Sequence, residues 1–65
     1  MDETYVVKVV NKVCAVYNSK GFFKRNLPPS DVKTATINEN VVTITQSNGY
    51  TMLYDAETGR QLGHL

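Results

Sequence analysis

The sequence contains no tryptophan, one cysteine and one histidine in 65 residues. Cys14 therefore has no partner for a disulfide within the chain. A zinc site built from several cysteine and histidine ligands is excluded as well, because Cys14 and His64 are the only two such residues. We expect no metal and no cofactor. A chain of this length buries only about 60% of its unfolded surface, so self-association becomes a natural source of extra stability.

An excess of charge and a long apolar segment are also lacking. Seven basic and six acidic residues give a formal net charge of +1, far from the strongly basic balance of a dedicated nucleic-acid-binding domain. The longest apolar runs, such as 13–16, are too short to span a bilayer, so we expect no membrane association. An acidic start without the apolar segment of a secretion signal, together with a lone thiol, predicts a cytoplasmic protein.

β-Branched and aromatic residues dominate the rest of the chain, and apolar residues do not recur at helical spacing. Candidate strands cover 5–10, 13–17, 22–27, 32–37, 41–46, 50–54 and 61–65. We predict one all-β domain, 1–65, with five to six antiparallel strands arranged as a small barrel or sheet. Polar and glycine-containing segments separate the strands, and the Asn48-Gly49 pair is a strong hairpin signal.

The two parts of the chain resemble each other as meander-like repeats, 5–27 and 32–65, separated by Pro28-Pro29. In this alignment Val16-Tyr17-Asn18 corresponds to Leu53-Tyr54-Asp55, and Gly21 corresponds to Gly59. The shared pattern is a strand, a tight turn, a strand ending in an aromatic residue, a turn begun by Asn or Asp and closed by glycine, and a return strand. Two ordinary meanders would produce the same pattern without a duplication.

The stretch Tyr50-Thr51-Met52-Leu53-Tyr54-Asp55-Ala56-Glu57-Thr58-Gly59 resembles the inner hairpin of β-propeller blades of the quinoprotein and WD type. In such blades an apolar strand ends in aspartate and a small Thr-Gly turn follows. The resemblance covers about a third of the chain and carries over no cofactor residue. It implies a blade-like unit, and because a propeller needs about four to eight blades, several copies would have to form one ring. A carbohydrate-binding unit of such an oligomer is one function that it suggests.

Catalytic chemistry is not indicated. Cys14 lies in the middle of a strand, which is typical of an inert buried thiol. His64 is the penultimate residue, and Asp55 with Glu57 falls in a turn where two carboxylates supply too few oxygens for calcium. We therefore predict that the protein is not an enzyme.

Two binding functions remain. The first is protein–protein interaction or self-association, since several strands are apolar on both faces and a one-sided sheet cannot bury both. Its candidate contacts are the aromatic residues Tyr5, Tyr17, Phe22, Phe23, Tyr50 and Tyr54, whose rings suit an interface; some of the tyrosines could equally lie at the rim of the core. The alternative is weak binding of single-stranded nucleic acid, in which bases stack on an aromatic ring between cations, with candidate residues Lys20, Phe22, Lys24 and Arg25. Strict strand alternation would place Phe22, Lys24 and Asn26 on one face and Phe23, Arg25 and Leu27 on the other.

Overall fold

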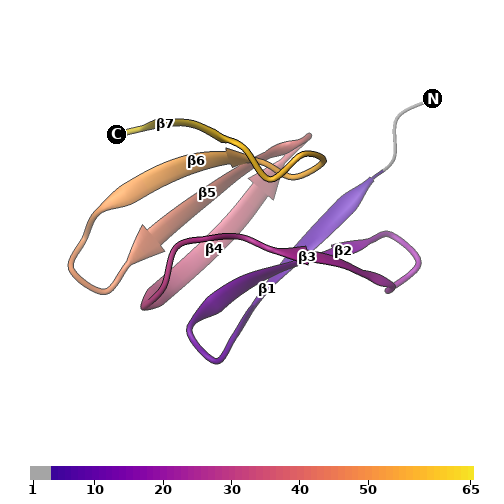
Figure 1. Cartoon of the computed structure of the whole chain (residues 1–65), viewed down its shortest axis with the longest axis horizontal. Helices are drawn as coiled ribbons and strands as arrows, with labels where there is room; N and C mark the ends of the chain where they lie inside the picture. Colours follow the sequence, from indigo (N-terminus) through magenta and orange to yellow (C-terminus); the bar gives the residue numbers. More distant parts are fainter. Residues whose placement is uncertain (1–3) are drawn as a thin grey trace.

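The computed structural model describes residues 4–65, which form seven antiparallel strands and no helix (Figure 1). The all-β prediction is confirmed. Seven strands form where five to six were expected, because all seven candidate segments pair, including the short edge segments Phe23–Asn26 and Gln61–His64. The strands make two separate sheets, so the barrel alternative is not realised. The predicted domain begins at residue 1, and its first three residues, including most of the acidic start, lie outside the described part.

The three-stranded sheet has the order β1-β2-β3, with β1 at Tyr5–Val10, β2 at Val13–Asn18 and β3 at Phe23–Asn26. Asn11 and Lys12 form the two-residue turn between β1 and β2, and both have positive φ, 52° and 64°. Two left-handed central residues give a turn whose twist matches that of the flanking strands. The β1–β2 hairpin is therefore fully paired from Tyr5↔Asn18 to Val10↔Val13.

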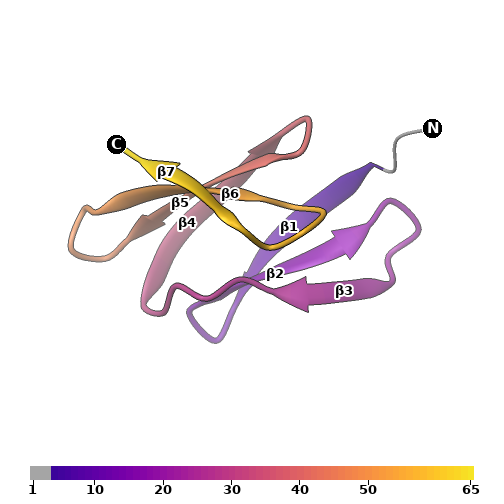
Figure 2. The same cartoon turned by 45° about the horizontal axis from the view of Figure 1, so that its top comes forward.

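The four-stranded sheet has the order β4-β5-β6-β7 (Figure 2), with β4 at Val32–Asn38, β5 at Val41–Gln46, β6 at Thr51–Asp55 and β7 at Gln61–His64. Residues 47–50 join β5 to β6, and the Gln46 amide donates to the Tyr50 carbonyl at 2.9 Å, which leaves three residues, 47–49, in the closed loop. Of the Asn48-Gly49 pair, only Gly49 has a positive φ, at 89°. Its amide donates to the Gln46 carbonyl at 2.9 Å, which closes the loop.

One hydrophobic core lies between the two sheets. The three-stranded sheet contributes Tyr5, Cys14 and Val16, and the four-stranded sheet contributes chiefly Val32, Val42, Ile44, Met52 and Tyr54. β1 and β4 are neighbours, and the Val32 amide donates to the Lys12 carbonyl at 2.9 Å, which ties the two sheets together at that corner. Each sheet therefore buries one face in the core and presents the other face outward.

The β2–β3 and β6–β7 hairpins share the same turn construction. The Asn18 Oδ1 accepts from the Lys20 and Phe22 amides at 2.9 Å, and an Asp55 Oδ1 accepts from the Glu57 and Thr58 amides at 2.8 and 3.3 Å. The amide of Gly21 donates back to the Asn18 carbonyl, as that of Gly59 does to the Asp55 carbonyl. Both glycines have positive φ, 90° and 80°. The predicted Asx-type turns closed by glycine are confirmed.

The same two hairpins also share one register. Tyr17 pairs with Phe23 as Tyr54 pairs with Gln61, and the bulge falls at the corresponding place in each, between Val16 and Tyr17 and between Leu53 and Tyr54. Beyond the bulge, the Leu27 amide donates to the Cys14 carbonyl at 2.9 Å, and the Leu65 amide donates to the Thr51 carbonyl at 3.0 Å. The sequence alignment of 15–27 with 52–65 therefore matches the pairing of the strands throughout.

The faces of these equivalent hairpins nevertheless point in opposite directions relative to the core. Val7 pairs with Val16, whereas Val42 pairs with Tyr54 rather than with Leu53. The cause is the length of the closed loop before each hairpin. Two residues lie between the paired Val10 and Val13, whereas three lie between Gln46 and Tyr50, whose carbonyl accepts from the Gln46 amide. A slip of one residue in strand pairing exchanges the two faces of a strand. Tyr54 therefore enters the core, and Tyr17 lies on the outer face.

Candidate interaction faces

The six aromatic residues expected at an interface divide into two groups. Tyr5 and Tyr54 are core residues, 4% and 6% exposed, so the structure does not place them where a partner could contact them. Tyr17 is half-buried on the outer side of the three-stranded sheet, and Phe22, Phe23 and Tyr50 are exposed. Alternation along single strands could not separate these groups, because both faces of the strands are apolar.

The outer side of the three-stranded sheet forms a largely apolar surface that we call the Tyr17 face. Cross-strand partners share a face of a sheet, and the pairs Val6↔Tyr17, Lys8↔Ala15, Val10↔Val13 and Tyr17↔Phe23 all point away from the core. Val6, Val10 and Phe23 are 44%, 45% and 55% exposed. The face consists of the apolar residues Val6, Val10, Val13, Ala15, Tyr17 and Phe23, and of the polar residues Lys8 and Asn26.

Lys8, Tyr17 and Phe23 contact one another on this face. The Tyr17 and Phe23 rings meet edge to face with centroids 5.8 Å apart, a favourable arrangement for two aromatic side chains. The Lys8 ammonium lies 5.3 Å from the centroid of the Tyr17 ring, within the distance of a cation–π interaction. Lys8 is the one charged side chain among the described residues of the Tyr17 face.

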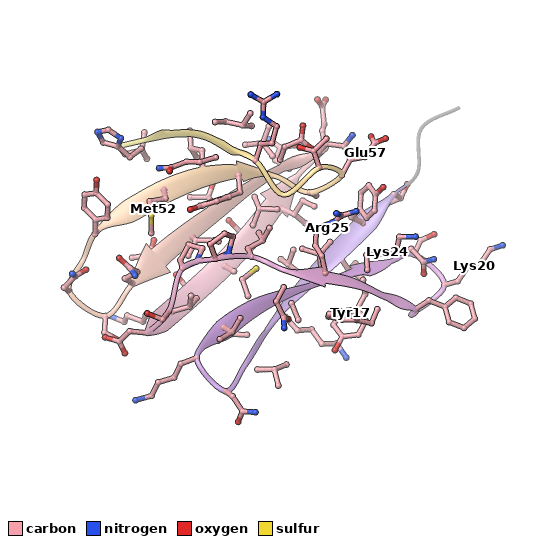
Figure 3. All side chains as sticks on the ribbon, in the orientation of Figure 1. Tyr17, Lys20, Lys24, Arg25, Met52 and Glu57 are labelled. Atoms are coloured by element: carbon pink, nitrogen blue, oxygen red, sulfur yellow. The ribbon has the colours of Figure 1, made fainter. Side chains whose placement is uncertain are left out.

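Of the four residues of the predicted nucleic-acid site, Arg25 is partly buried, and Lys20, Phe22 and Lys24 are exposed. The bulge puts Arg25 opposite Val16, which is fully buried, while Phe23 stays opposite Tyr17 on the outer face. The expectation that Phe23, Arg25 and Leu27 share one face was therefore wrong, because a bulged strand carries an extra residue that breaks alternation. Figure 3 shows Arg25 directed toward the turn that holds Glu57, away from Tyr17, while Lys20 lies at the tip of the β2–β3 turn.

Arg25 acts as a packing residue in this position. A Cβ atom at Gly59 would lie 3.4 Å from the Arg25 Cδ and 4.0 Å from the Leu27 Cδ2, so β3 and the β6–β7 turn are in close contact. The Arg25 Nε is buried without a hydrogen-bond partner. Lys20, Phe22 and Lys24 remain exposed, and Phe22 is 66% exposed.

The outer side of the four-stranded sheet is a second candidate surface, which the sequence patterns did not single out. Its central part is rich in threonine, and Asp55, paired with Val41, places one charge at its end. Its cross-strand pairs are Thr34↔Thr45, Thr36↔Thr43, Thr43↔Leu53 and Thr45↔Thr51. The hydroxyls of Thr45 and Thr51 are 3.3 Å apart. We call this surface the Leu53 face and define it by Thr34, Thr36, Thr43, Thr45, Thr51 and Leu53. The Thr-Ala-Thr and Thr-Ile-Thr patterns of 34–36 and 43–45 were its signal.

His64 and Cys14, the only histidine and cysteine of the sequence, are both poorly placed for catalysis. The His64 ring stacks on Tyr50, with centroids 5.9 Å apart and planes 22° apart, so both side chains lie at the end of the β6–β7 pair. Cys14 is fully buried, and burial raises the pKa of its thiol from 9.0 to about 11. A thiol that stays protonated at neutral pH is a poor nucleophile.

Residues 4–65 contain no group of three histidine, cysteine, aspartate or glutamate side chains that could hold a metal ion. They also contain no helix that is long and apolar enough to cross a bilayer.

Comparison with known proteins supplies no relative. No protein-family model, no curated protein and no solved structure matches the chain.

Proposed function

We propose that the protein is a non-enzymatic β module that self-associates through its Tyr17 face. One observation carries the proposal. The β2–β3 and β6–β7 hairpins have the same register, but the face of β6–β7 that carries Tyr54 is buried under the other sheet, and the face of β2–β3 that carries Tyr17 is not.

Apolar side chains on the Tyr17 face favour burial. Val6, Val10 and Phe23 are each more than a third exposed, and burial of apolar surface contributes about 25 cal/mol per Å². Tyrosine and phenylalanine are enriched at protein interfaces because their rings contribute a large area for few rotatable bonds. A second copy supplies the kind of β-sheet surface that already covers the equivalent face around Tyr54.

The test is the molar mass of the protein in solution, measured by light scattering after size-exclusion chromatography over a range of concentrations. We expect an oligomer that persists at high salt, since apolar burial is not screened by ions. The variant Phe23→Ser should dissociate it, and the matched control Phe22→Ser should not, because Phe22 is more exposed than Phe23 but is not one of the residues of the Tyr17 face. A wild-type protein that is monomeric at every concentration would overturn the proposal.

Single-strand nucleic-acid binding stays a prediction with a smaller set of residues. Lys20, Phe22 and Lys24 are exposed near the β2–β3 turn, and Arg25 lies on the other side of the strand from Phe23. Fluorescence anisotropy with a labelled oligonucleotide tests it. Binding that falls steeply with salt and that is lost in Lys20→Ala and Phe22→Ala would support this function, because phosphate contacts release counterions. The carbohydrate-binding unit of an oligomeric propeller likewise stays a prediction from the resemblance.

A further inference from the structure

We propose that the surface receiving the Tyr17 face is the Leu53 face of a second copy, so that chains assemble head to tail. This inference rests on the proposed self-association and names the two surfaces that meet. It starts from the contact inside one chain, where the side of the four-stranded sheet that carries Tyr54 packs against the side of the three-stranded sheet that carries Val16.

The equivalence of the two hairpins extends this internal contact from one chain to the next. Tyr17 corresponds to Tyr54, and Leu53 corresponds to Val16, in hairpins with the same register and the same bulge. The internal contact therefore joins the side of one hairpin that carries Tyr54 to the side of the other hairpin that carries Val16. Repetition of that contact between two copies joins the Tyr17 face of one to the Leu53 face of the other. Figure 1 shows the two sheets side by side in one chain, with their outer faces on opposite sides of the molecule.

The polar groups of the two faces also favour this pairing over a two-fold one. Lys8 pairs with Ala15 next to the centre of the Tyr17 face. The equivalent pair in the four-stranded sheet, Ile44 with Met52, is apolar. A two-fold contact between Tyr17 faces would bring the Lys8 ammonium toward its own copy, and like charges in a desolvated interface repel. The Leu53 face offers threonine hydroxyls instead, which accept hydrogen bonds from an ammonium group.

The Leu53 face has the properties that a sheet-packing partner requires. Its defining residues are uncharged, and the β-branched side chains of its threonines pack well against another sheet. Asp55, which pairs with Val41 at the end of β6, has a carboxylate oxygen that already accepts two amides of its own turn. A head-to-tail contact does not close on itself in a two-fold dimer, so the assembly is a ring or an open chain of more than two copies.

The experiment uses one variant for each face. Phe23→Asp disables the Tyr17 face and leaves the Leu53 face intact. Thr36→Lys places a cation on the Leu53 face, where it repels the incoming Lys8, and leaves the Tyr17 face intact. Thr36→Val is the matched control, because it keeps the shape of the side chain without the charge, and circular dichroism checks that every variant folds.

Each of the two charged variants should be monomeric alone, and the equimolar mixture should form a one-to-one heterodimer. Heteronuclear NMR locates the contact. Labelled Phe23→Asp chain, titrated with unlabelled Thr36→Lys chain, should show shifts confined to the outer residues of β4, β5 and β6. With the labels exchanged, the shifts should fall on β1, β2 and β3. Thr36→Val should keep the wild-type mass.

Two results would overturn the head-to-tail contact and leave self-association standing. One is a Thr36→Lys variant that still assembles like the wild type, which would indicate a contact between Tyr17 faces. The other is a mixture of the two variants that stays monomeric while the wild type assembles. A wild-type chain that never assembles would instead overturn the proposed function itself.

Discussion

Tyr17 and Tyr54 occupy the same position in two β-hairpins of identical register, yet Tyr54 lies in the core and Tyr17 lies on the outer face. The difference arises before the hairpins begin, in the loops that lead into β2 and β6. One residue more in the second loop exchanges the two faces of the following strand. The tyrosine at this position of the hairpin therefore lies in the core in one copy of the hairpin and on the surface in the other.

This relationship predicts different consequences for the same substitution. Tyr54→Ala removes a buried aromatic ring, a change that costs about 3–5 kcal/mol, comparable to the whole stability of a core in a chain of this size. We expect it to leave the chain largely unfolded. Tyr17→Ala should keep the fold with a smaller loss of stability and should weaken assembly. Urea denaturation and light scattering measure the two effects, and equal losses of stability would contradict the assignment of the faces.

Lys8 is expected to limit the strength of self-association. Removing an ammonium group from water costs free energy that hydrogen bonds to neutral threonine hydroxyls return only in part. Lys8→Met should therefore tighten assembly by about tenfold or more, where tenfold corresponds to about 1.4 kcal/mol. Sedimentation velocity over a dilution series measures the change. Lys20→Met, in the exposed β2–β3 turn, is the control and should have little effect; a tightening of equal size there would show that net charge alone is responsible.

The two glycines that close the equivalent turns provide a matched pair. Gly21 and Gly59 have φ of 90° and 80°, a region that costs other residues about 1–2 kcal/mol. We expect Gly21→Ala and Gly59→Ala each to lower the free energy of unfolding by about that amount. Asparagine tolerates the left-handed conformation better, so Gly21→Asn and Gly59→Asn should lose less. Chemical denaturation tests this order, and an alanine variant as stable as the wild type would contradict the turn geometry.

We expect the free energy of unfolding to decrease in alkaline solution because the Cys14 thiol is buried. Burial raises the pKa of the folded-state thiol from 9.0 to about 11, so between these values the unfolded chain loses a proton that the folded chain keeps. Folding is then progressively disfavoured as pH rises, with the full stability present below about pH 9. Urea midpoints measured from pH 7 to 11 should fall more steeply for the wild type than for Cys14→Ala, which removes this group and leaves the other titrating groups in place. Parallel curves would contradict the assignment.

Much of the fold could be predicted from the sequence because it depends on local chemistry. The strand 41–46 is β-branched and was expected at the bounds that the structure shows, and the turn after Asp55 follows from one carboxylate and one glycine. The candidate site was less predictable. Phe23 and Arg25 are two residues apart, and strict alternation placed them together, but the bulge opposite Tyr17 separates them.

The amino-acid sequence by itself determined the all-β class, the positions of the turns and the equivalence of 15–27 with 52–65, since each depends on neighbouring residues only. Tertiary structure alone decided which apolar face of each strand meets the core. That choice depends on the register between strands and on the packing of one sheet against the other, and both involve residues far apart in the chain. The Tyr17 face and the Leu53 face are therefore visible only in the folded molecule.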